Sequence, residues 1–210
     1  RGNAVKDETK GIFEELFSRY PALEACRADV AAAYETLLAT YRAHGTVFTC
    51  GNGGSASDSE HIVGELLKKF KKHRDIPAAL RAQLRAQGAE GAALAEALEG
   101  SLGAVSLVSM TGILTAFAND VGWDAAFAQQ LLGLVRPGDA LVALSTSGNS
   151  RNCVNAVRLA RARGVKTVGL TGEGGGRFRE LCDVAICVPA RETYRIQEFH
   201  LPVYHALCAM

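Results

Sequence analysis

The chain has 210 residues, 48% of them hydrophobic, and a formal net charge of only +1. This composition suits one α/β domain with an added helical region and a sizeable core. The balanced charge argues against the broad basic field that drives binding to nucleic acids or membrane surfaces, so we expect neither partner. No apolar run reaches the roughly 18 to 20 residues of a membrane helix, and residues 1–7 show no signal-peptide core. These features predict a soluble, cytoplasmic protein.

Six cysteines are scattered along the chain without a C-x-x-C pair. Free cysteine behaves as a small hydrophobic residue, and several of the six lie in apolar helix or strand patterns. We therefore expect buried, reduced thiols rather than a zinc site built from cysteine.

The order of the predicted elements indicates the fold class. Apolar residues recur at helical spacing between residues 10 and 44, interrupted by Pro21, and predict two helices before the first strand. Five short apolar runs that read as strands then follow, mostly separated by helical patterns. The runs are 46–50, 104–108, 140–144, 166–170 and 184–188. This alternation predicts a single α/β domain over residues 1–210, a three-layer αβα sandwich around a five-stranded, mainly parallel sheet.

Two segments depart from this alternation. Residues 71–100 are rich in Ala, Arg, Gln and Glu and predict a helical insertion, which we interpret as a solvated cap or a subunit-contact helix, with a substrate lid as the alternative. The last segment, from Tyr194, is helical by its pattern. Pro202 inside it lacks an N–H donor and should kink the helix.

The most informative stretch runs from Gly51 to Glu65, directly after the first predicted strand. Its glycines permit backbone conformations that other residues avoid, so an anion could approach the peptide N–H groups closely. A helix that opens near Ser55 would add its positive dipole end, and Ser55 and Ser57 would add hydroxyl groups. We call this stretch the first cradle and expect it to bind an anion such as phosphate.

A second cradle, Ser145 to Ser150, follows the third strand and precedes a helix expected to begin near Arg151. A serine-rich turn alone is usually a helix cap, but two such turns at the carboxyl edge of one sheet favour ligand binding. Neither cradle has the Walker pattern or the G-x-G-x-x-G spacing, so a nucleotide is not the favoured ligand. The loop 171–176 has only one hydroxyl and is interpreted as flexible.

His61 and Glu65 lie four residues apart, on one face of the helix after the first cradle. An imidazole and a carboxylate at this spacing could bind Zn²⁺ together, or simply stabilise the helix. The last helix adds Gln197, His200 and His205, which could also be core or interface residues. Gln197 and His205 are separated by a rise of about 12 Å, so one ion could bind both only if it lay between them.

Asn119 and Asp120 follow an apolar stretch that begins no obvious long helix. On local grounds we interpret them as a turn rich in side-chain donors and acceptors.

Together these motifs resemble the sugar-isomerase (SIS) domain superfamily, and more closely its sedoheptulose 7-phosphate isomerases. The resemblance rests on residues 51–55 with His61 and Glu65, on 145–150, and on 195–198 followed by His205. It implies a flavodoxin-like SIS domain in a bacterial cytoplasmic homotetramer with shared active sites, in which the helices of residues 1–44 serve oligomerisation. It also implies one Zn²⁺ per subunit, held by His61, Glu65, Gln197 and His205. The substrate contacts that it implies are Asn52, Gly53, Gly54, Ser55, Glu65, Asn119, Asp120, Ser145, Thr146, Ser147, Ser150 and Gln197.

The implied reaction converts D-sedoheptulose 7-phosphate to D-glycero-D-manno-heptose 7-phosphate through an enediol, the first step of bacterial ADP/GDP-heptose biosynthesis. We expect Glu65 to act as the base at C1, His205 as the acid–base partner on the oxygens, and zinc as a Lewis acid. One alternative is a non-catalytic SIS protein that acts by protein contact, as replication-initiator-associating factors do. Another is an isomerase of a different sugar phosphate.

Overall fold

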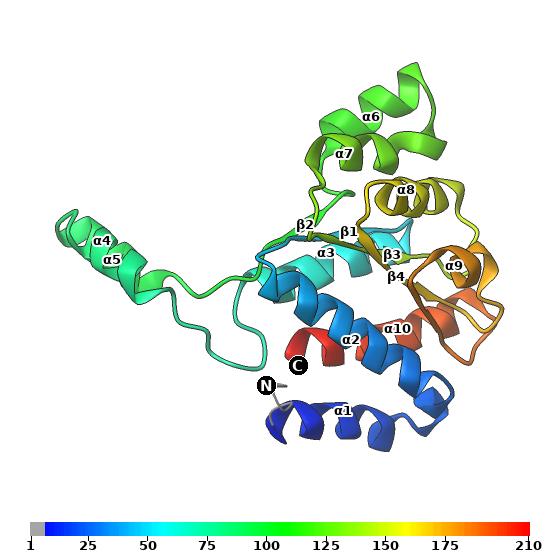
Figure 1. The fold of residues 1–210 in the computed structure, drawn as a ribbon, viewed down its shortest axis with the longest axis horizontal. Helices are drawn as coiled ribbons and strands as arrows, with labels where there is room; N and C mark the ends of the chain where they lie inside the picture. Colours follow the sequence, from blue (N-terminus) through cyan, green and yellow to red (C-terminus); the bar gives the residue numbers. More distant parts are fainter. Residues whose placement is uncertain (1–6) are drawn as a thin grey trace.

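The computed structural model describes residues 7–210, and residues 1–6, which include most of the stretch inspected for a signal peptide, lie outside the described part. Its centre is a sheet of five parallel strands in the order β2-β1-β3-β4-β5, the order of flavodoxin-like folds (Figure 1). The strands are β1 (Val47–Cys50), β2 (Ala104–Ser106), β3 (Ala140–Leu144), β4 (Lys166–Thr171) and β5 (Val184–Cys187). The predicted five-stranded parallel sheet is confirmed, and each strand begins and ends within two residues of its predicted run.

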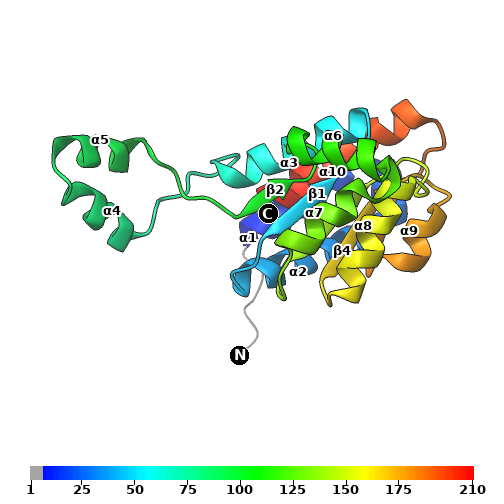
Figure 2. The same cartoon turned by 90° about the horizontal axis from the view of Figure 1, so that it is seen from above.

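Helices cover both faces of the sheet and complete the three-layer sandwich (Figures 1 and 2). The first face carries α1 (Asp7–Arg19), the 3-10 turn Pro21–Cys26, α2 (Arg27–Arg42), α3 (Gly54–Leu67) and α10 (Thr193–Ala209). The second face carries α6 (Thr111–Asp120), the 3-10 turn Trp123–Ala125, α7 (Ala126–Leu134), α8 (Arg151–Ala162) and α9 (Gly176–Leu181). The two N-terminal helices expected from the periodicity are present.

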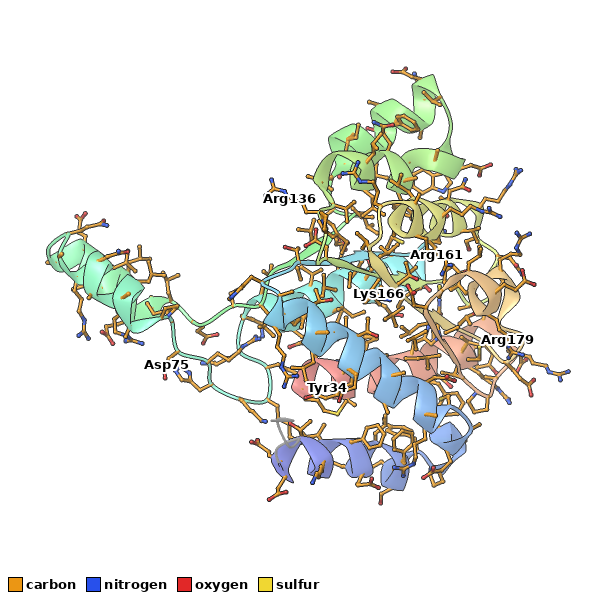
Figure 3. All side chains as sticks on the ribbon, in the orientation of Figure 1. Tyr34, Asp75, Arg136, Arg161, Lys166 and Arg179 are labelled. Atoms are coloured by element: carbon orange, nitrogen blue, oxygen red, sulfur yellow. The ribbon has the colours of Figure 1, made fainter. Side chains whose placement is uncertain are left out.

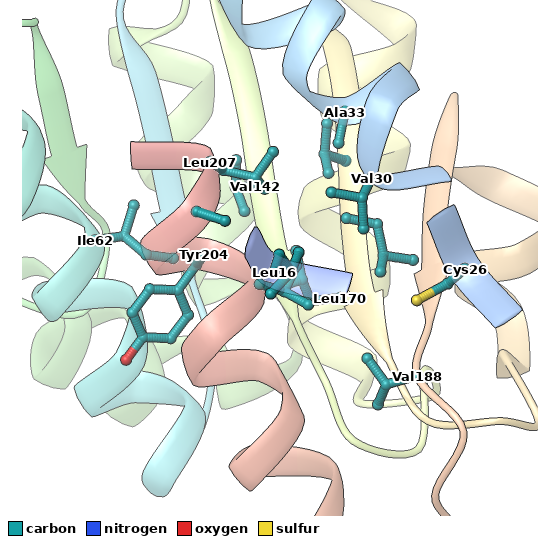
Figure 4. Packing of buried hydrophobic residues seen from close by; sticks show 14 of the residues in the cluster. Leu16, Cys26, Val30, Ala33, Ile62, Val142, Leu170, Val188, Tyr204 and Leu207 are labelled. Carbon is teal, nitrogen blue, oxygen red and sulfur yellow. The ribbon is translucent and has the colours of Figure 1, made fainter. Parts of the chain in front are cut away.

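Alternation along the strands divides the core between these two layers. Val47 and Val142 belong to the cluster under α2, α3 and α10, whereas Phe48 and Leu141 belong to the cluster under α6, α7 and α8. Figure 4 shows the first cluster, in which α10 packs beside α3 on this face of the sheet. Every residue of β3 is buried, as expected of a central parallel strand with helices on both faces.

The segment between α3 and β2 forms an arm outside the sandwich. It contains α4 (Ala78–Arg85) and α5 (Ala89–Ala97), and both ribbon views show it pointing away from the sheet (Figures 1 and 2). Within these helices only Gly91 and Ala95 are buried, and the side chains of the arm stand in solvent (Figure 3). The arm therefore has almost no core of its own.

The base of the arm is fastened to the end of α3. The guanidinium of Arg74 donates to the carbonyl oxygens of Glu65 and Lys68, and the carbonyl of Arg74 accepts from the Gly100 N–H at 2.7 Å. Lys69 forms an ion pair with Glu99 at 2.8 Å. The arm is thus attached at its root, next to the helix that carries His61 and Glu65.

All six cysteines have free thiols, three of them fully buried. Among residues 7–210, no helix has the length and apolarity needed to cross a membrane.

Candidate active site

The first cradle is a tight glycine turn at the end of β1. Gly53 has φ 57°, in the left-handed region that favours glycine, and α3 begins at Gly54. A Cβ on Gly51 would lie 2.4 Å from the Ser55 carbonyl oxygen, so only glycine fits there. The amides of Ser55 and Ala56 already donate within the turn, to the carbonyls of Asn52 and Gly53. A ligand at this cradle would therefore depend on the glycine backbone and on side chains.

Asn52 and Asn152 connect the two cradles. Their carboxamides form a reciprocal pair of hydrogen bonds of 2.9 and 2.8 Å, and Asn152 lies in the first turn of α8, only 2% exposed. This pair fixes the loop after β1 to the helix after the second cradle. It also occupies the side chain of Asn52, one of the expected substrate contacts.

The second cradle is a compact ring of hydroxyl groups. Ser145 Oγ lies 2.9 Å from Ser150 Oγ and 3.5 Å from Ser147 Oγ, and it accepts a hydrogen bond from the Ser150 N–H. Gly148 has φ 67°, and a Cβ there would lie 2.1 Å from the Gly175 carbonyl oxygen. Helix α8 begins at Arg151, as predicted. Three hydroxyls that now bond one another can turn toward a phosphate at the start of a helix.

A pocket of about 400 Å³ lies beside this cradle, lined by Thr146 and Ser147 and by the loop after β4. Arg191 lines the same pocket and is paired with Glu173. Gly172 is held by a hydrogen bond from its N–H to the Thr146 carbonyl, at 3.0 Å, so the loop that was expected to be flexible packs against the cradle.

His61, Glu65 and His205 form a cluster whose potential ligand atoms all lie within 4.8 Å of one another. His61 Nε2 is 3.1 Å from Glu65 Oε1 and 3.3 Å from His205 Nε2. Helices α3 and α10 bring the three together. His61 lies seven residues beyond Gly54, a rise of about 10 Å, so the cluster is set back from the carboxyl edge where the cradles are.

The donor set of this cluster fits a metal ion. Glu65 Oε2 is buried and has no hydrogen-bond partner, whereas buried polar atoms normally have one. Two imidazoles and one carboxylate with a position left open for solvent or substrate are also a common catalytic zinc set. Burial, and then the neighbouring His61 ring, lower the pKa of His205, which favours the neutral imidazole that a metal needs.

Two further residues adjoin the cluster. The Tyr204 hydroxyl donates to Asp58 Oδ1 at 2.9 Å and lies 3.0 Å from His61 Nδ1. Tyr204 is only 1% exposed, and Figure 4 shows its hydroxyl on the α3 side of the core. Burial raises the pKa of Asp58, and the hydrogen bond from Tyr204 and the two histidines oppose that shift.

Comparison with known proteins identifies the family. A profile of the SIS domain matches residues 100–209. The chain is 37% identical to a phosphoheptose isomerase of Rhodospirillum rubrum, over 98% of this chain and 96% of that one. It is 40% identical to a phosphoheptose isomerase of Akkermansia muciniphila, over 98% of this chain and 94% of that one. The chain belongs to the phosphoheptose isomerase family of SIS-domain proteins.

A solved structure of this family has a similar fold. Phosphoheptose isomerase GmhA from Neisseria gonorrhoeae matches with a TM-score of 0.72 at 32% identity, covering 96% of this chain and 95% of that chain. The resemblance drawn from the motifs is thereby confirmed. The matched SIS stretch begins after α3, so the first cradle, His61 and Glu65 lie outside it but inside the span shared with the whole relatives.

The family's expected substrate contacts fall into separate places within one chain. Gln197 lies beside the first cradle, since a Cβ on Gly54 would come within 2.6 Å of Gln197 Nε2. Asn119 and Asp120 are exposed and hydrogen-bonded to each other at 2.9 Å. The prediction of a turn at Asn119 and Asp120 is wrong, because these residues end α6. The chain turns just after them, at Val121 and Gly122, and Gly122 has φ 141°.

Gln197 precedes His205 by eight residues on α10, so an ion shared by the two must still lie between them. His200, the other histidine of α10, is fully buried and its Nε2 lies 3.3 Å from the Thr171 carbonyl oxygen. His200 is therefore a core residue, and its burial lowers its pKa to about 4.

The sequence analysis missed Asp58, Asn152 and Tyr204. Asp58 shares a helical face with His61 and Glu65, and that spacing could have suggested it. No local pattern points to Asn152 or Tyr204, because their partners are 100 and 146 residues away.

Proposed function

We propose that this protein is an aldose–ketose isomerase that converts D-sedoheptulose 7-phosphate to D-glycero-D-manno-heptose 7-phosphate. The observation that carries the proposal is the His61–Glu65–His205 cluster, which brings two imidazoles and a partly unsatisfied carboxylate together in a chain of this family. Isomerisation through an enediol needs a base at carbon and a proton carrier at oxygen, and these residue types supply both.

The phosphate of the substrate would bind at the second cradle. Ser145, Ser147 and Ser150 would turn their hydroxyls toward it, with the start of α8 adding favourable dipole charge. Thr146 lines the adjoining pocket, and Gln197 would reach the sugar from the first cradle. Binding through the remote phosphate would orient the carbons that react. The remaining expected contacts are Asn52, Gly53, Gly54, Ser55, Asn119 and Asp120.

The proton transfers are assigned to Glu65 and His205. Glu65 would remove a proton from C1 of the ketose and return it to C2, which leaves an aldehyde at C1 and a hydroxyl at C2. His205 would move a proton between the C1 and C2 oxygens, so the reaction consumes no other reagent. The neutral form that burial favours for His205 suits this exchange.

We assign Zn²⁺ to the same cluster, one per subunit, with His61, Glu65 and His205 as ligands and Gln197 as the expected fourth. When bound, zinc would polarise the substrate carbonyl as a Lewis acid. A carboxylate held by a metal is a weaker base, so Glu65 would act as ligand and as base in different steps.

The test is conversion of sedoheptulose 7-phosphate in D₂O, followed by NMR, before and after chelation. We expect the aldoheptose phosphate to form with deuterium at C2, and chelation to abolish its formation. Absence of turnover after zinc is restored to a folded protein would contradict the proposal and favour a protein-contact role or another sugar phosphate.

We further propose a cytoplasmic homotetramer with active sites completed between subunits. The distance between the cradles and the cluster within one chain supports sharing, and six free thiols suit a reducing compartment. In the arm, Leu80 of α4, Leu94 of α5 and Leu98 just after α5 are 40, 48 and 41% exposed. The two helices are too short to be stable alone, so we interpret the arm as a subunit contact rather than a lid.

Light scattering after size exclusion tests the assembly. We expect the unchanged protein to run as a tetramer and Leu94→Glu to shift it to smaller species. Gln83→Glu, at an exposed polar position of the same arm, is the matched control and should leave the mass unchanged. A monomeric unchanged protein would contradict the proposal.

A further inference from the structure

Tyr204 occupies an unusual position between the core and the cluster. Its ring is buried in the core cluster on the first face of the sheet, and its centroid lies 5.5 Å from that of His61 and 5.1 Å from that of His205. Its hydroxyl is the one polar atom of this side chain, and it contacts Asp58 Oδ1 at 2.9 Å and His61 Nδ1 at 3.0 Å. A phenylalanine would fill the same space, so packing alone does not explain the hydroxyl.

The direction of these hydrogen bonds can be worked out from proton counts. An ionised carboxylate such as Asp58 can only accept, so the single proton of the Tyr204 hydroxyl points to Asp58. The phenol oxygen must then accept from His61, which places the ring proton of His61 on Nδ1. Consequently His61 Nε2 is left with a free lone pair.

That lone pair points into the cluster. His61 Nε2 is 3.1 Å from Glu65 Oε1 and 3.3 Å from His205 Nε2, and Glu65 Oε2 is buried without a hydrogen bond. Two acceptors, the His61 Nε2 lone pair and the Glu65 carboxylate, therefore face each other, and at 3.1 Å they repel unless a cation lies beside them. The tautomer that Asp58 and Tyr204 impose is therefore the one in which His61 can bind a metal.

We propose that Asp58 and Tyr204 are positioning residues that act in series, Asp58 on Tyr204 and Tyr204 on His61, to hold His61 in the Nδ1–H tautomer with Nε2 aimed at the metal. Partners that hold the second nitrogen of a metal-binding histidine fix the ring orientation and raise its affinity for the ion. This inference rests on the zinc site proposed above, and deepens it by naming residues that touch neither the ion nor the substrate.

The first experiment measures metal affinity by competition with a chelating indicator, using Zn²⁺ and Co²⁺, and it needs no substrate. Tyr204→Phe keeps the ring and removes the hydroxyl, and we expect the affinity to fall about 10–100-fold, with a changed visible spectrum of bound Co²⁺. Tyr41→Phe is the matched control, because Tyr41 donates to the Gly103 carbonyl oxygen and to no residue of the cluster, and the affinity of this variant should equal that of the unchanged protein.

The second experiment tests the series arrangement. Asp58→Ala frees the Tyr204 proton to turn toward His61, which favours the wrong tautomer, so the affinity should fall although Asp58 has no hydrogen bond to His61. In the Tyr204→Phe background the same change should have a much smaller effect. If Asp58→Ala lowered the metal affinity equally in both backgrounds, Asp58 would act through its charge alone, and the proposed series of Asp58, Tyr204 and His61 would be overturned.

The third experiment reads the tautomer itself. Long-range ¹H–¹⁵N NMR of the metal-free protein, at alkaline pH where imidazoles are neutral, should show His61 protonated at Nδ1, and this preference should vanish in Tyr204→Phe. A Nε2–H tautomer in the unchanged protein, unaltered metal affinity in Tyr204→Phe, or an unchanged protein that binds neither metal would overturn the inference.

These outcomes are separable from those of the proposed function. An unchanged protein that isomerises sedoheptulose 7-phosphate while Tyr204→Phe binds metal normally would leave the function standing and overturn the inference. If the unchanged protein does not isomerise the sugar, but Tyr204→Phe lowers its metal affinity, the proposed function is contradicted and the inference stands.

Discussion

Two carboxylates show how differently two regions of this protein use a buried charge. Asp139 lies at the entrance to β3, is 7% exposed, and accepts hydrogen bonds of 2.7 Å from the Thr46 N–H on one oxygen and from the Arg136 N–H on the other. Glu65 lies on α3 and faces α10; one of its oxygens faces His61, and the other is buried without a hydrogen bond, its nearest cation being Lys68 Nζ at 3.9 Å. Asp139 is satisfied within the fold, and Glu65 is not.

The difference separates structural from functional groups. A buried carboxylate with all its hydrogen bonds joins the elements around it, here the starts of β1 and β3. A buried carboxylate oxygen without a hydrogen bond costs stability, and a bound ligand can supply the missing interaction. The first kind should therefore matter for folding and the second for chemistry, and substitutions can test each side of this contrast.

The largest effect is expected at Glu65. Glu65→Gln keeps the shape but removes the charge needed for proton abstraction and metal binding, so kcat should fall about 10²–10⁴-fold. Because Oε2 makes no hydrogen bond within the fold, the melting temperature of the metal-free protein should hardly change. Steady-state kinetics and calorimetry check both parts, and Glu99→Gln, at the root of the arm, is the control that should keep kcat. Full activity in Glu65→Gln would remove its assignment as the base.

Asp139 should show the opposite pattern. In Asp139→Asn one oxygen is replaced by an NH₂ group that faces a backbone N–H, so the free energy of unfolding should fall by about 1–3 kcal/mol. The kcat per folded molecule should stay the same, because the residue lies far along the chain from the cluster and contacts none of its members. Urea unfolding measures the first quantity and titration of folded active sites the second. A stable Asp139→Asn variant with a lowered kcat would contradict the structural role assigned to Asp139.

The sheet was readable from the sequence because its strands are short apolar runs buried on both faces. The bounds of β3 agree with the predicted 140–144, and α8 begins at the predicted Arg151, directly after the serine cluster. The turn at Asn119 was misplaced because the helical pattern of residues 111–120 was not recognised, although Gly122, two residues beyond its end, is a usual helix-ending signal.

The candidate site could be predicted from the sequence only in part. The spacing of His61 and Glu65 predicts a shared helical face, and the two ligand atoms do lie 3.1 Å apart. The hydrogen bonds of Tyr204 depend on how α10 packs against α3, and no local pattern carries that information. Composition likewise predicted helices between residues 71 and 100, but their projection from the sandwich follows from the contacts at the root of the arm.

A smaller effect is expected where α3 meets α10. In Gly54→Ala the new Cβ would come within 2.6 Å of Gln197 Nε2, and that side chain would have to move away from the first cradle. We expect KM for the sugar phosphate to rise about tenfold, with stability little changed, since a flexible side chain can yield. Gly64→Ala is the matched control on the same helix, because nothing lies within 4 Å of its Cβ position. It should leave KM unchanged and stabilise the protein by about 0.5–1 kcal/mol, and an equal KM in both variants would contradict the placement of Gln197.

The smallest effects on stability are expected for two partly buried carboxylates, Asp183 and Asp29. The sign of the pH dependence of stability should distinguish a carboxylate that accepts hydrogen bonds from one that does not. Burial raises the pKa of Asp183, but hydrogen bonds from the Thr167 hydroxyl at 2.8 Å and the Thr167 N–H at 2.9 Å outweigh it, so its pKa in the folded state is lowered. Its contribution to stability is then complete above the unfolded pKa of about 3.9 and is lost as the pH falls through the folded value. The stability difference between the unchanged protein and Asp183→Asn should therefore shrink below about pH 4.

For Asp29 we expect the opposite pH dependence of stability. Burial raises its pKa, only partly offset by Arg179, so its charge opposes folding at neutral pH and ceases to do so once the group is protonated. Asp29→Asn should accordingly be more stable than the unchanged protein at neutral pH, and this gain should disappear as the pH falls. Urea unfolding of both variants between neutral and acid pH measures the two slopes. If the slopes had the same sign, hydrogen-bond satisfaction would not be what distinguishes the carboxylates of this fold, and the contrast between Asp139 and Glu65 would lose its physical basis.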